Sequence, residues 1–463
     1  MIRSRKSRRL TAVTAAAVSA GVILAGCASS DGGGSDKASG TWPGAKISEC
    51  SGLDQLSQYG DLTGKTLEVY TSITPPEGDT QVASYALFEK CTGAKVKYNA
   101  NKDFEKNVLV RAQGNDLPDI AYVPQPGLLK QLVDTGTVAT PPKDVETNVD
   151  KWWSKDWKTY GTVDGKFYAA PLGANMKSFV WYSPSMFKQH NWTVPTTWDD
   201  MMKLTDTIQK SGITPWCAGF ESGDATGWPG TDWVEEVMLR TAGPDVYDKW
   251  ISHDIPFNDP QVATALDTVG KILKNPKYVN GGLGDVKSIN GTAFGDAGLP
   301  ILKGKCAMMQ MAGFYAANWP KGTTVAPDGQ VFAFYEPTVD PSKGTPVEGG
   351  GEFVASFNKK PATQAFQTYL STDVWANEKA KATPGGGWLS ANKGLDVNNL
   401  VSPIDQLSAK TLADPNTVFR FDASDAMPGA VGSGTFWKEM VNWISGQSTK
   451  DTLDNIEASW PAS

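Results

Sequence analysis

Strands and helices alternate at short spacing through the first third of the chain, and this pattern constrains the fold more than any other feature. Thr66–Tyr70 and Lys95–Tyr98 have the apolar runs of short strands, and Phe104–Gln113 has the apolar spacing of a helix. A further strand, loop and helix follow in LPDIAYVPQPGLLKQLVDTG. This alternation predicts a parallel sheet with helices on its faces. Ligands of such sheets bind beyond the carboxyl ends of the strands, so we expect Ser72–Asp79 and Pro124–Gly127 to form one binding edge.

The loop after the first strand leads into another predicted helix. Asp79 is placed to cap its start, and Gly93 is placed to end it. Its apolar face is expected to consist of Val82, Tyr85, Ala86 and Phe88.

A long extended stretch, DGKFYAAPLGANMKSFVWYS, interrupts the alternation. It has apolar runs at both ends and is interpreted as a strand that leaves one lobe, crosses, and enters another. A second strand–helix pattern follows, with helices predicted over Trp198–Lys210 and Trp233–Thr241 and a strand over Thr214–Ala218. The stretch GGGEFVASF and the helix Pro361–Leu370 are interpreted as the return to the first lobe. The length of the chain also suits two lobes.

The N-terminal residues have the pattern of a secretory signal. A basic segment, MIRSRKSRR, precedes the alanine- and valine-rich run Leu10–Leu24, which is too short to span a membrane. The run ends in LAGC, which resembles a bacterial lipobox, so Cys27 is expected to carry a lipid. Residues 1–26 are thus predicted to be a lipoprotein signal peptide and residues 27–46 a lipidated flexible linker. An ordinary signal cut near Ala25 is the alternative, and export by the Sec or the twin-arginine route stays open.

Composition excludes several classes of function. The 43 basic residues are outnumbered by 50 acidic ones, and no basic stripe marks a nucleic-acid surface. His190 and His253 are the only histidines and have no neighbouring ligands, so neither a histidine-based metal site nor a catalytic triad is expected. No second apolar run reaches membrane-spanning length. We therefore expect no metal, no cofactor and no nucleic-acid partner, and membrane attachment through the lipid alone.

Four cysteines remain besides Cys27, and an even number in an exported chain predicts two disulfides. Four cysteines allow three connectivities. We favour Cys50–Cys91, which would join the N-terminal extension to the end of the first helix, and Cys217–Cys306 within the other lobe. Neither pair has the CxxC spacing of a redox centre.

Several segments, in their order along the chain, resemble one known family. They are FEKCTGAKVKY, GNDLPDIAYVPQPG, DGKFYAAPLGANMKSFVWYS, the loop Glu221–Trp233, GGGEFVASFNKKPATQAFQTYLS and DAMPGAVGSGTFWKEM. Together they resemble the extracellular solute-binding proteins of bacterial sugar ABC importers, the family that includes maltose-binding protein. WCAGFESGDATGWPGTDW and FDASDAMPG are most similar to its α-glucoside-binding branch.

The resemblance implies an α/β fold of the two-lobed periplasmic-binding-protein type II, in which two doubly wound sheets are joined by crossover segments with a cleft between them. Such proteins are known to close around ligand. The first lobe is expected to comprise residues 47–174 and 350–383, and the second lobe residues 175–349 and 384–463. The implied partners are a small sugar and the permease subunits of an ABC importer. The implied protein is a monomer, lipid-anchored at the extracellular face of the cell membrane, and is not an enzyme.

The stretch GFESGDATGWPGTDWVEE places carboxylates and tryptophans on a glycine-rich loop. Glu221 follows a strand and lies where the family carries a sugar-binding acid, with a solvated loop acid as the alternative. Trp228 has no apolar periodicity and is expected to stack on a sugar ring. Asp232 and Glu235 fit a helix cap with its capping-box glutamate, and this interpretation is favoured over a ligand contact, which stays possible for a capping residue. Asp224 is expected to be a turn residue.

Further candidate ligand contacts lie on other loops. Because Asp79 is assigned to a helix cap, Glu77 is the acid chosen after the first strand, and Lys177 has an ion pair within the protein as its alternative role. The resemblance implies an aromatic platform at Phe314 and Tyr315, of which one is expected to stack and the other to pack. Trp437 matches an aromatic of the family, but core burial is favoured for it at least equally. The remaining candidates are Gln125, Asn175, Gly350, Gly351 and Asp425.

Three functions remain for such a site. The first is a binding protein that captures an α-linked di- or oligosaccharide by lobe closure and delivers it to a permease. The second is a glycoside hydrolase, in which Glu221 with Asp224 or Asp232 would supply acid and base, although the two-lobed pattern is unlike a hydrolase barrel. The third keeps the fold but binds a polyol, a glycerophosphodiester or a peptide. No catalytic residue is assigned.

Overall fold

The computed structural model describes residues 42–281, 283–340, 342 and 344–461. The predicted signal peptide and Cys27 lie outside the described residues. The end of the predicted flexible linker is folded instead, because Pro43–Lys46 form a short 3-10 helix (η1) and Trp42 packs into the core. Within the described residues, no helix has both the length and the apolar character needed to cross a membrane.

The first sheet has five strands in the order β2-β1-β3-β13-β6. β1 (Thr66–Thr71) pairs in parallel with β2 (Lys95–Ala100) and with β3 (Ile120–Val123). β13 (Phe353–Ser356) is antiparallel to β3 and to β6 (Ala170–Pro171). The parallel strands predicted from the alternation and the predicted return to the first lobe are both confirmed.

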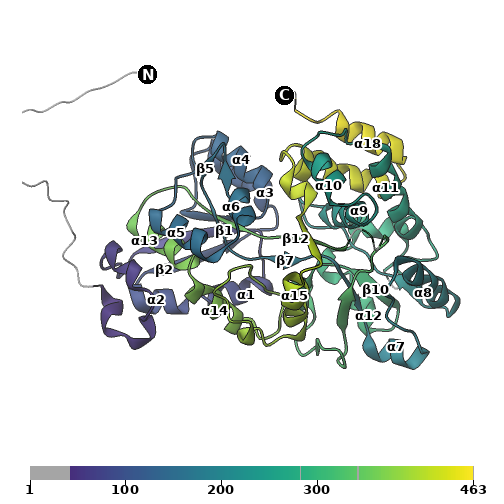
Figure 1. The fold of residues 1–463 in the computed structure, drawn as a ribbon, viewed down its shortest axis with the longest axis horizontal. Coiled ribbons are helices and arrows are strands. Elements are labelled where there is room, and N and C mark those ends of the chain that lie inside the picture. Colours follow the sequence, from purple (N-terminus) through teal and green to yellow (C-terminus); the bar gives the residue numbers. More distant parts are fainter. Residues whose placement is uncertain (1–41, 282, 341, 343, 462–463) are drawn as a thin grey trace, which may run out of the picture. The chain divides into compact units, whose positions relative to one another are not determined.

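The helices of this part of the chain surround the first sheet (Figure 1). α3 and α13 have the predicted bounds. The helices around this sheet are α1 (Glu77–Ala83), α2 (Ala86–Thr92), α3 (Phe104–Gln113), α4 (Pro126–Asp134), α5 (Lys143–Trp152), α6 (Lys155–Tyr160), α13 (Pro361–Leu370) and α14 (Asp373–Lys381).

The single helix predicted from Asp79 to Gly93 is two helices. Asp79 lies inside the first turn of α1 rather than at its cap, and Val82 is exposed. The helical segment is interrupted between α1 and α2. At this point Tyr85 is buried in the core, and its hydroxyl forms a hydrogen bond of 2.8 Å with the Tyr122 hydroxyl. The apolar spacing continues across the break, so periodicity alone does not reveal it.

The second sheet has the order β11-β8-β10-β9. β8 (Phe179–Tyr182) is antiparallel to β10 (Cys306–Gln310) and to β11 (Phe332–Tyr335), and β10 is parallel to β9 (Thr214–Trp216). Its helices, the second group in Figure 1, are α7 (Pro184–His190), α8 (Trp198–Lys210), α9 (Trp228–Thr241), α10 (Pro244–Ile251), α11 (Pro260–Leu273), α12 (Leu299–Leu302), α17 (Trp437–Ile444) and α18 (Thr449–Glu457).

The predicted crossing segment is divided among four sheets, beginning with β5 (Lys166–Phe167), which pairs with β4 (Thr162–Val163) in a two-stranded sheet. β6 belongs to the first sheet, β8 belongs to the second, and β7 (Asn175–Met176) joins a small sheet of order β14-β12-β7 between them (Figure 1). In this small sheet β12 (Thr345–Gly350) is antiparallel to β7 and parallel to β14 (Thr417–Phe421). The expected two-lobed α/β fold with crossover segments is confirmed.

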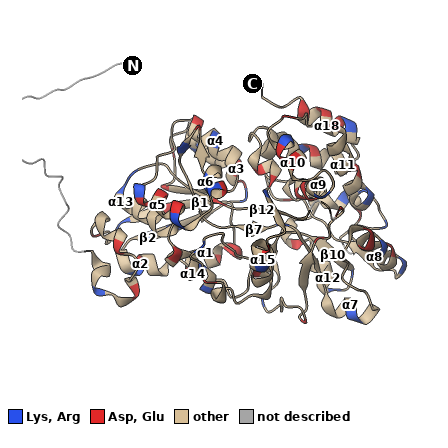
Figure 2. Ribbon diagram, viewed as in Figure 1, with Lys and Arg blue, Asp and Glu red and all other residues tan. Residues whose placement is uncertain are grey.

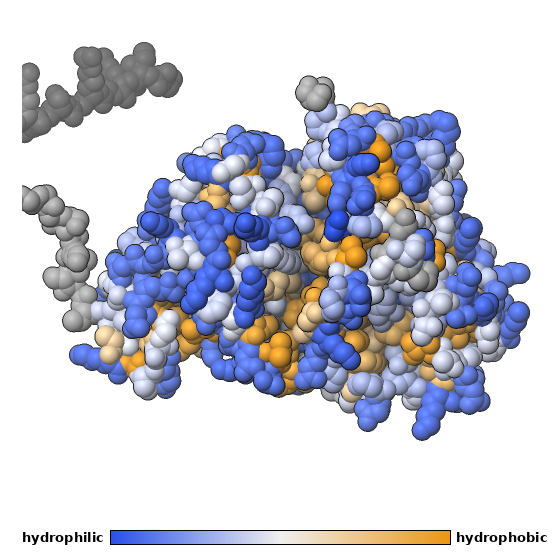
Figure 3. Space-filling view, in the orientation of Figure 1, coloured by the Kyte–Doolittle hydropathy of each residue, from blue (hydrophilic) through white to orange (hydrophobic). Residues whose placement is uncertain are grey.

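The residues after α14 contribute to the core of the first lobe. Trp388, Leu389 and Leu400 pack in the same hydrophobic cluster as Val69 and Phe88, although residues 384–463 were expected in the second lobe. The following α15 (Pro403–Ala413) and α16 (Ala423–Ala426) flank β14. Charged residues of both signs are interspersed along the ribbon (Figure 2). The face seen in Figure 3 is mostly hydrophilic, with apolar colour between the two halves.

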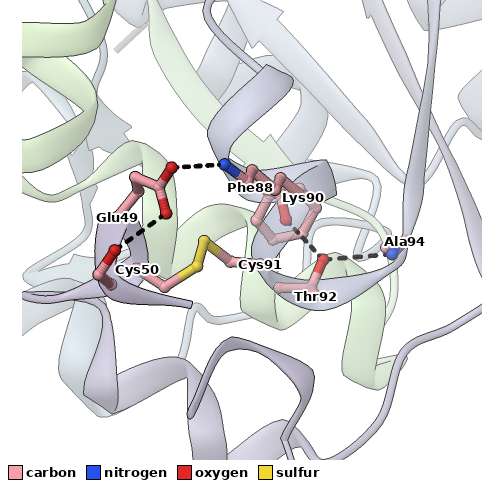
Figure 4. Close-up of a disulfide and its surroundings, with 8 residues drawn as sticks. Glu49, Cys50, Phe88, Lys90, Cys91, Thr92 and Ala94 are labelled. Carbon is pink, nitrogen blue, oxygen red and sulfur yellow. Dashed lines mark hydrogen bonds and ion pairs between the residues drawn. A yellow bond between two sulfur atoms is a disulfide. The ribbon is translucent and has the colours of Figure 1, made fainter. Parts of the chain in front are cut away.

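Both favoured disulfides are present. Cys50 and Cys91, with a Cα–Cα distance of 5.8 Å, tie the N-terminal segment to the end of α2, beside an ion pair between Glu49 and Lys90 (Figure 4). Cys217 and Cys306, with a Cα–Cα distance of 6.0 Å, connect the end of β9 to β10.

Candidate ligand-binding site

A cavity lined by elements of both lobes gathers the polar loops predicted from the sequence. Its wall includes Ser72–Thr74 after β1 and Pro124–Gln125 after β3. The two loops that were expected to form one binding edge therefore do line the same cavity. The second lobe contributes the loop before α9 and the 3-10 helix η6 (Gly313–Asn318). The volume of the cavity, about 170 Å³, is roughly tenfold what one water molecule needs.

Most of the predicted site residues line this cavity. They are Glu77, Gln125, Asn175, Lys177, Trp228, Phe314, Gly351 and Asp425. Gly351 is also a packing requirement, because a Cβ there would lie 2.3 Å from the carbonyl oxygen of Gly173 and 2.9 Å from the ring of Trp157. The role of each residue in binding stays a prediction.

Two predicted residues lie off the wall for packing reasons. Tyr315 is fully buried, and its hydroxyl donates to the Gly295 carbonyl at 2.8 Å, so of the aromatic pair Phe314 lines the cavity and Tyr315 packs. Gly350 ends β12, and its N–H donates to Oδ1 of Asn175 at 3.0 Å. That N–H is therefore already used within the protein.

Glu221 also lies off the cavity wall, in contacts that connect the two lobes. Its Oε1 is 3.1 Å from Nζ of Lys102, which precedes α3. In the same loop, Asp224 is 2.9 Å from Nζ of Lys106, and its N–H donates to Asp103 at 2.9 Å. We call these the α3–loop contacts. Asp224 is thus more than the turn residue expected of it.

Asp232 is not a helix cap. α9 begins at Trp228, about one turn earlier than predicted, with Gly227 as its N-cap and Pro229 in its first turn. Asp232 is therefore inside the helix, and it is 1% exposed. Its Oδ1 accepts from Nζ of Lys177 at 2.8 Å, so Asp232 lies behind the wall and acts on the cavity through that lysine.

Lys177 is the centre of a buried ionic cluster. Its ammonium group also donates to Asp422, and Glu348 is 4.0 Å away. We call Lys177, Asp232, Glu348 and Asp422 the Lys177 cluster. Burial raises the pKa of Asp232 to about 7, although the attraction of Lys177 opposes this. Burial acts in the same direction on Asp422, but Lys177 and the hydrogen bonds prevail there and lower its pKa. The alternative role foreseen for Lys177, an ion pair within the protein, is therefore present, while Lys177 also lines the cavity.

More buried acids lie behind the cluster. Glu235 accepts from the N–H groups of Ala423 and Ser424 at 2.9 and 3.2 Å, and Glu236 pairs with Arg240. Burial raises the pKa of Glu235 well above its usual range. Oxygens of Asp232, Glu348 and Asp422 lie within 4.8 Å of one another, which is a carboxylate set able to hold a cation. The ammonium group of Lys177 contacts two of these three acids and is the cation at this point.

An aromatic surface forms the wall on the side of the second lobe. The ring of Trp228 is 5.2 Å from that of Phe294 and 6.0 Å from that of Phe314, measured between centroids. Nζ of Lys177 lies 5.6 Å from the Trp228 ring. Trp437, at the start of α17, adds a fourth aromatic residue to the wall. Such rings suit the C–H face of a sugar, because both surfaces are apolar and flat.

Carboxylates form the wall on the side of the first lobe. Burial raises the pKa of Glu77 to about 8, and repulsion from Glu352 adds to this. Burial also raises the pKa of Glu105 to about 7. Nearby, burial lowers the pKa of Lys379 to about 8. These groups offer oxygen acceptors and, where protonated, O–H donors to a ligand rich in hydroxyl groups.

Several residues of the wall were not predicted. Trp437 was assigned at least equally to the core because Phe436, Met440 and Trp443 surround it at helical spacing, and it is in fact both buried and on the wall. Glu105 has the sequence signature of an ordinary first-turn acid of α3. The unpredicted residues include Glu105, Phe294, Asn318, Glu352, Asp422 and Trp437.

Comparison with known proteins supports this arrangement. The family described as bacterial extracellular solute-binding protein matches residues 70–382. The chain is 38% identical to the osmoprotective compounds-binding protein GgtB of Synechocystis sp., over 87% of this chain and 94% of that protein. It is 35% identical to the alpha-glucosides-binding periplasmic protein AglE of Rhizobium meliloti, over 88% of this chain and 90% of that protein.

Solved structures show the same fold. The bacterial solute receptor AcbH, at 19% sequence identity, superposes with a TM-score of 0.72 over 85% of this chain and 97% of its own. The superposition covers most of both chains. This match, the two lobes and the cavity that both lobes line all agree with the family of the sequence relatives. The chain therefore belongs to the bacterial extracellular solute-binding proteins.

Proposed function

We propose that this protein is the substrate-binding lipoprotein of a bacterial sugar ABC importer, and that it captures α-glucoside di- or oligosaccharides by lobe closure and hands them to the membrane permease. The observation that carries the proposal is the pairing of two surfaces on one cavity. Trp228, Phe294 and Phe314 supply flat apolar faces, and Glu77 and Glu105 supply acceptors for hydroxyl groups.

The names of the relatives bear on the ligand class. AglE is described as binding alpha-glucosides and covers most of this chain, which favours that class. GgtB is described as binding osmoprotective compounds, so a small polar solute that is not an oligosaccharide is the alternative. The acid-rich wall disfavours a glycerophosphodiester, because a phosphate would meet the carboxylates of Glu77, Glu105 and Glu352.

The remaining parts of the proposal concern place and partners. The lipobox-like LAGC supports anchoring through Cys27 at the outer face of the membrane, with the protein acting as a monomer. Binding and release need no covalent chemistry, so we propose no catalytic role for the buried acids. Lobe closure would bury the sugar and present a surface of both lobes to the permease.

Calorimetry tests the ligand class. The mature full-length protein is titrated with trehalose, sucrose, maltose, isomaltulose, maltotriose and glucose, and each sample is then assayed for released monosaccharide. Saturable binding of an α-glucoside without hydrolysis is expected. If none of the six sugars binds, the alternative solute is favoured. If glucose is released, the protein is an enzyme rather than a binding protein.

A pair of variants connects the result to the cavity. Trp228→Ala is expected to weaken binding about tenfold, equivalent to about 1.4 kcal/mol, because one stacking face is lost. Trp192→Ala is the matched control, since Trp192 is also half-buried but is absent from the cavity wall. Equal affinities for the two variants would show that Trp228 does not contribute to ligand binding.

A further inference from the structure

Three buried polar atoms on the cavity wall have no hydrogen-bond partner among the described residues. They are Oε2 of Glu105, Oε1 of Gln125 and Nε1 of Trp437. Leaving a buried polar atom unpaired is costly, and such atoms are few in native proteins. Because their residues line the cavity, a ligand bound there is a group that can supply the missing hydrogen bonds. Two of the three atoms are acceptors, and these two are neighbours.

The acceptors of Glu105 and Gln125 are held in a defined arrangement. Nε2 of Gln125 donates to Oε1 of Glu105 at 3.3 Å, and this bond directs the amide N–H₂ to the carboxylate. The amide oxygen and the second carboxylate oxygen are therefore the atoms left over. Because each of these atoms can only accept from a ligand while Glu105 is ionised, the pair calls for a ligand that donates hydrogens.

Both side chains are mounted on rigid elements. Gln125 is the N-cap residue of α4 directly after β3, it is 4% exposed, and its carbonyl accepts from the N–H of Leu129 at 2.9 Å. Glu105 lies in the first turn of α3. Side chains on such supports keep their geometry better than side chains on loops.

The start of α3 is in addition tied to the second lobe. Lys102 and Asp103 before the helix and Lys106 in its first turn make the α3–loop contacts with Glu221 and Asp224. These residues flank Glu105 on both sides in the sequence. In this structure the start of α3, which carries Glu105, is therefore in contact with elements of both lobes.

We propose that Glu105 and Gln125 form a specificity-determining acceptor pair, which binds neighbouring hydroxyl groups on one edge of a sugar ring and discriminates against ligands that lack them. This inference rests on the proposed function, because it takes the ligand to be a sugar. Among the described residues, neither of the two acceptor atoms has a hydrogen-bond partner. Burial raises the pKa of Glu105 to about 7, which is consistent with a carboxyl group that gains a hydrogen-bond partner only from the ligand.

The discriminating ligands are monodeoxy disaccharides. Hydrogen bonds to a charged buried acceptor support a discrimination of roughly ten- to a hundredfold. Trehalose, sucrose and maltose are therefore compared by calorimetry with their monodeoxy derivatives on the mature full-length protein. At least one deoxy derivative of the disaccharide that binds is expected to lose roughly ten- to a hundredfold in affinity.

Substitutions of Glu105 test whether this residue causes the loss of affinity for the deoxy derivative. In Glu105→Ala the parent disaccharide is expected to bind as weakly as the deoxy derivative binds to the wild type, and the difference between the two ligands disappears. Glu105→Gln keeps an acceptor oxygen and is expected to lose less. Glu146→Gln, an acid of α5 on the surface, is the matched control and should behave as wild type.

A stability readout separates this role from a structural one. In the double variant Glu105→Leu/Gln125→Leu both unpaired acceptors are replaced by apolar groups, which is expected to leave the melting temperature without sugar unchanged or higher while affinity falls. A structural role would lower the melting temperature. If the single variants bind the parent and deoxy sugars as the wild type does, the inference is overturned and the proposed function survives. If no disaccharide binds to the wild type, both are overturned.

Discussion

Two sets of ion pairs at this site use the same side-chain types and differ in burial. The α3–loop contacts are solvated, with side-chain exposures of 59% and 33% for Lys102 and Glu221. In the Lys177 cluster the corresponding exposures are 7% for Lys177 and 2% for Asp232. The first set connects the lobes at the surface. The second lies at the cavity wall, which Lys177 and Asp422 line, with Asp232 behind it.

The difference in burial decides what each set can do. An exposed ion pair contributes about 0.2–1 kcal/mol and is screened by salt, so it is suited to contacts that form and break. A buried pair gains little net stability but is costly to break, because the remaining charge is left without a partner. We therefore interpret the α3–loop contacts as an adjustable connection and the Lys177 cluster as a fixed support.

The largest effect is expected from removing the charge of Lys177. Lys177→Met leaves Asp232, Glu348 and Asp422 without their cation, and the free energy of unfolding is expected to fall by about 3–5 kcal/mol. Urea unfolding measures this loss. Lys102→Met is the matched control at the surface. Similar losses for both variants would show that burial does not separate the two sets.

The pH dependence of stability should have opposite signs for Asp232, in the Lys177 cluster, and for Glu221, in the α3–loop contacts. The folded state raises the pKa of Asp232 to about 7, so between the unfolded value near 4 and that pH the folded protein binds more protons. The free energy of unfolding therefore falls as pH rises through this window. The pKa of Glu221 is lowered by the Gly223 N–H and by Lys102, so its contribution is present above its unfolded pKa and is lost as pH falls.

This sign difference is measured by urea unfolding across a series of pH values. Asp232→Asn is expected to flatten the decline on the neutral side, and Glu221→Gln is expected to leave it unchanged. A decline of the same slope in Asp232→Asn and the wild type would assign the proton uptake to other buried acids, such as Glu77.

A glycine in the loop tests the geometry of the α3–loop contacts. Gly223 has a φ of 61°, and a Cβ there would lie 2.3 Å from Oδ1 of Asp103. Gly223→Ala is expected to cost about 1–2 kcal/mol for the left-handed backbone and more for displacing Asp103. Gly212→Ala is the matched control, because its φ is 85° and nothing lies within 4 Å of the added methyl group. Equal thermal destabilisation of both variants would argue against a close contact at Asp103.

The smallest effect is expected for the exposed pair itself. A double-mutant cycle with Lys102→Ala and Glu221→Ala should give a coupling energy of about 0.2–1 kcal/mol. This coupling should shrink as salt is added, because the pair is solvated. Thermal unfolding at low and high salt measures it. A coupling that salt does not change would place the pair in a desolvated environment.

Local patterns predicted much of the architecture. α3, α8 and α13 have the predicted bounds because apolar spacing and terminal residues are properties of the chain itself. The crossing segment and both disulfides were also predicted, and most of the proposed site residues do meet at one cavity. The errors include the first helix, which is two helices, and Asp232, which lies inside α9 and pairs with the distant Lys177.

The sequence by itself therefore determined the alternation of strands and helices, the crossing between lobes and the choice of loops that carry polar residues. Only the tertiary structure decided what those polar residues contact. Asp232 lies in a helix and holds Lys177, Glu221 holds Lys102, and Glu105 is left with an unpaired oxygen at the cavity. The physical reason is that helix and strand periodicity depends on near neighbours, whereas the pairing and burial of a charge depend on segments far apart in the chain.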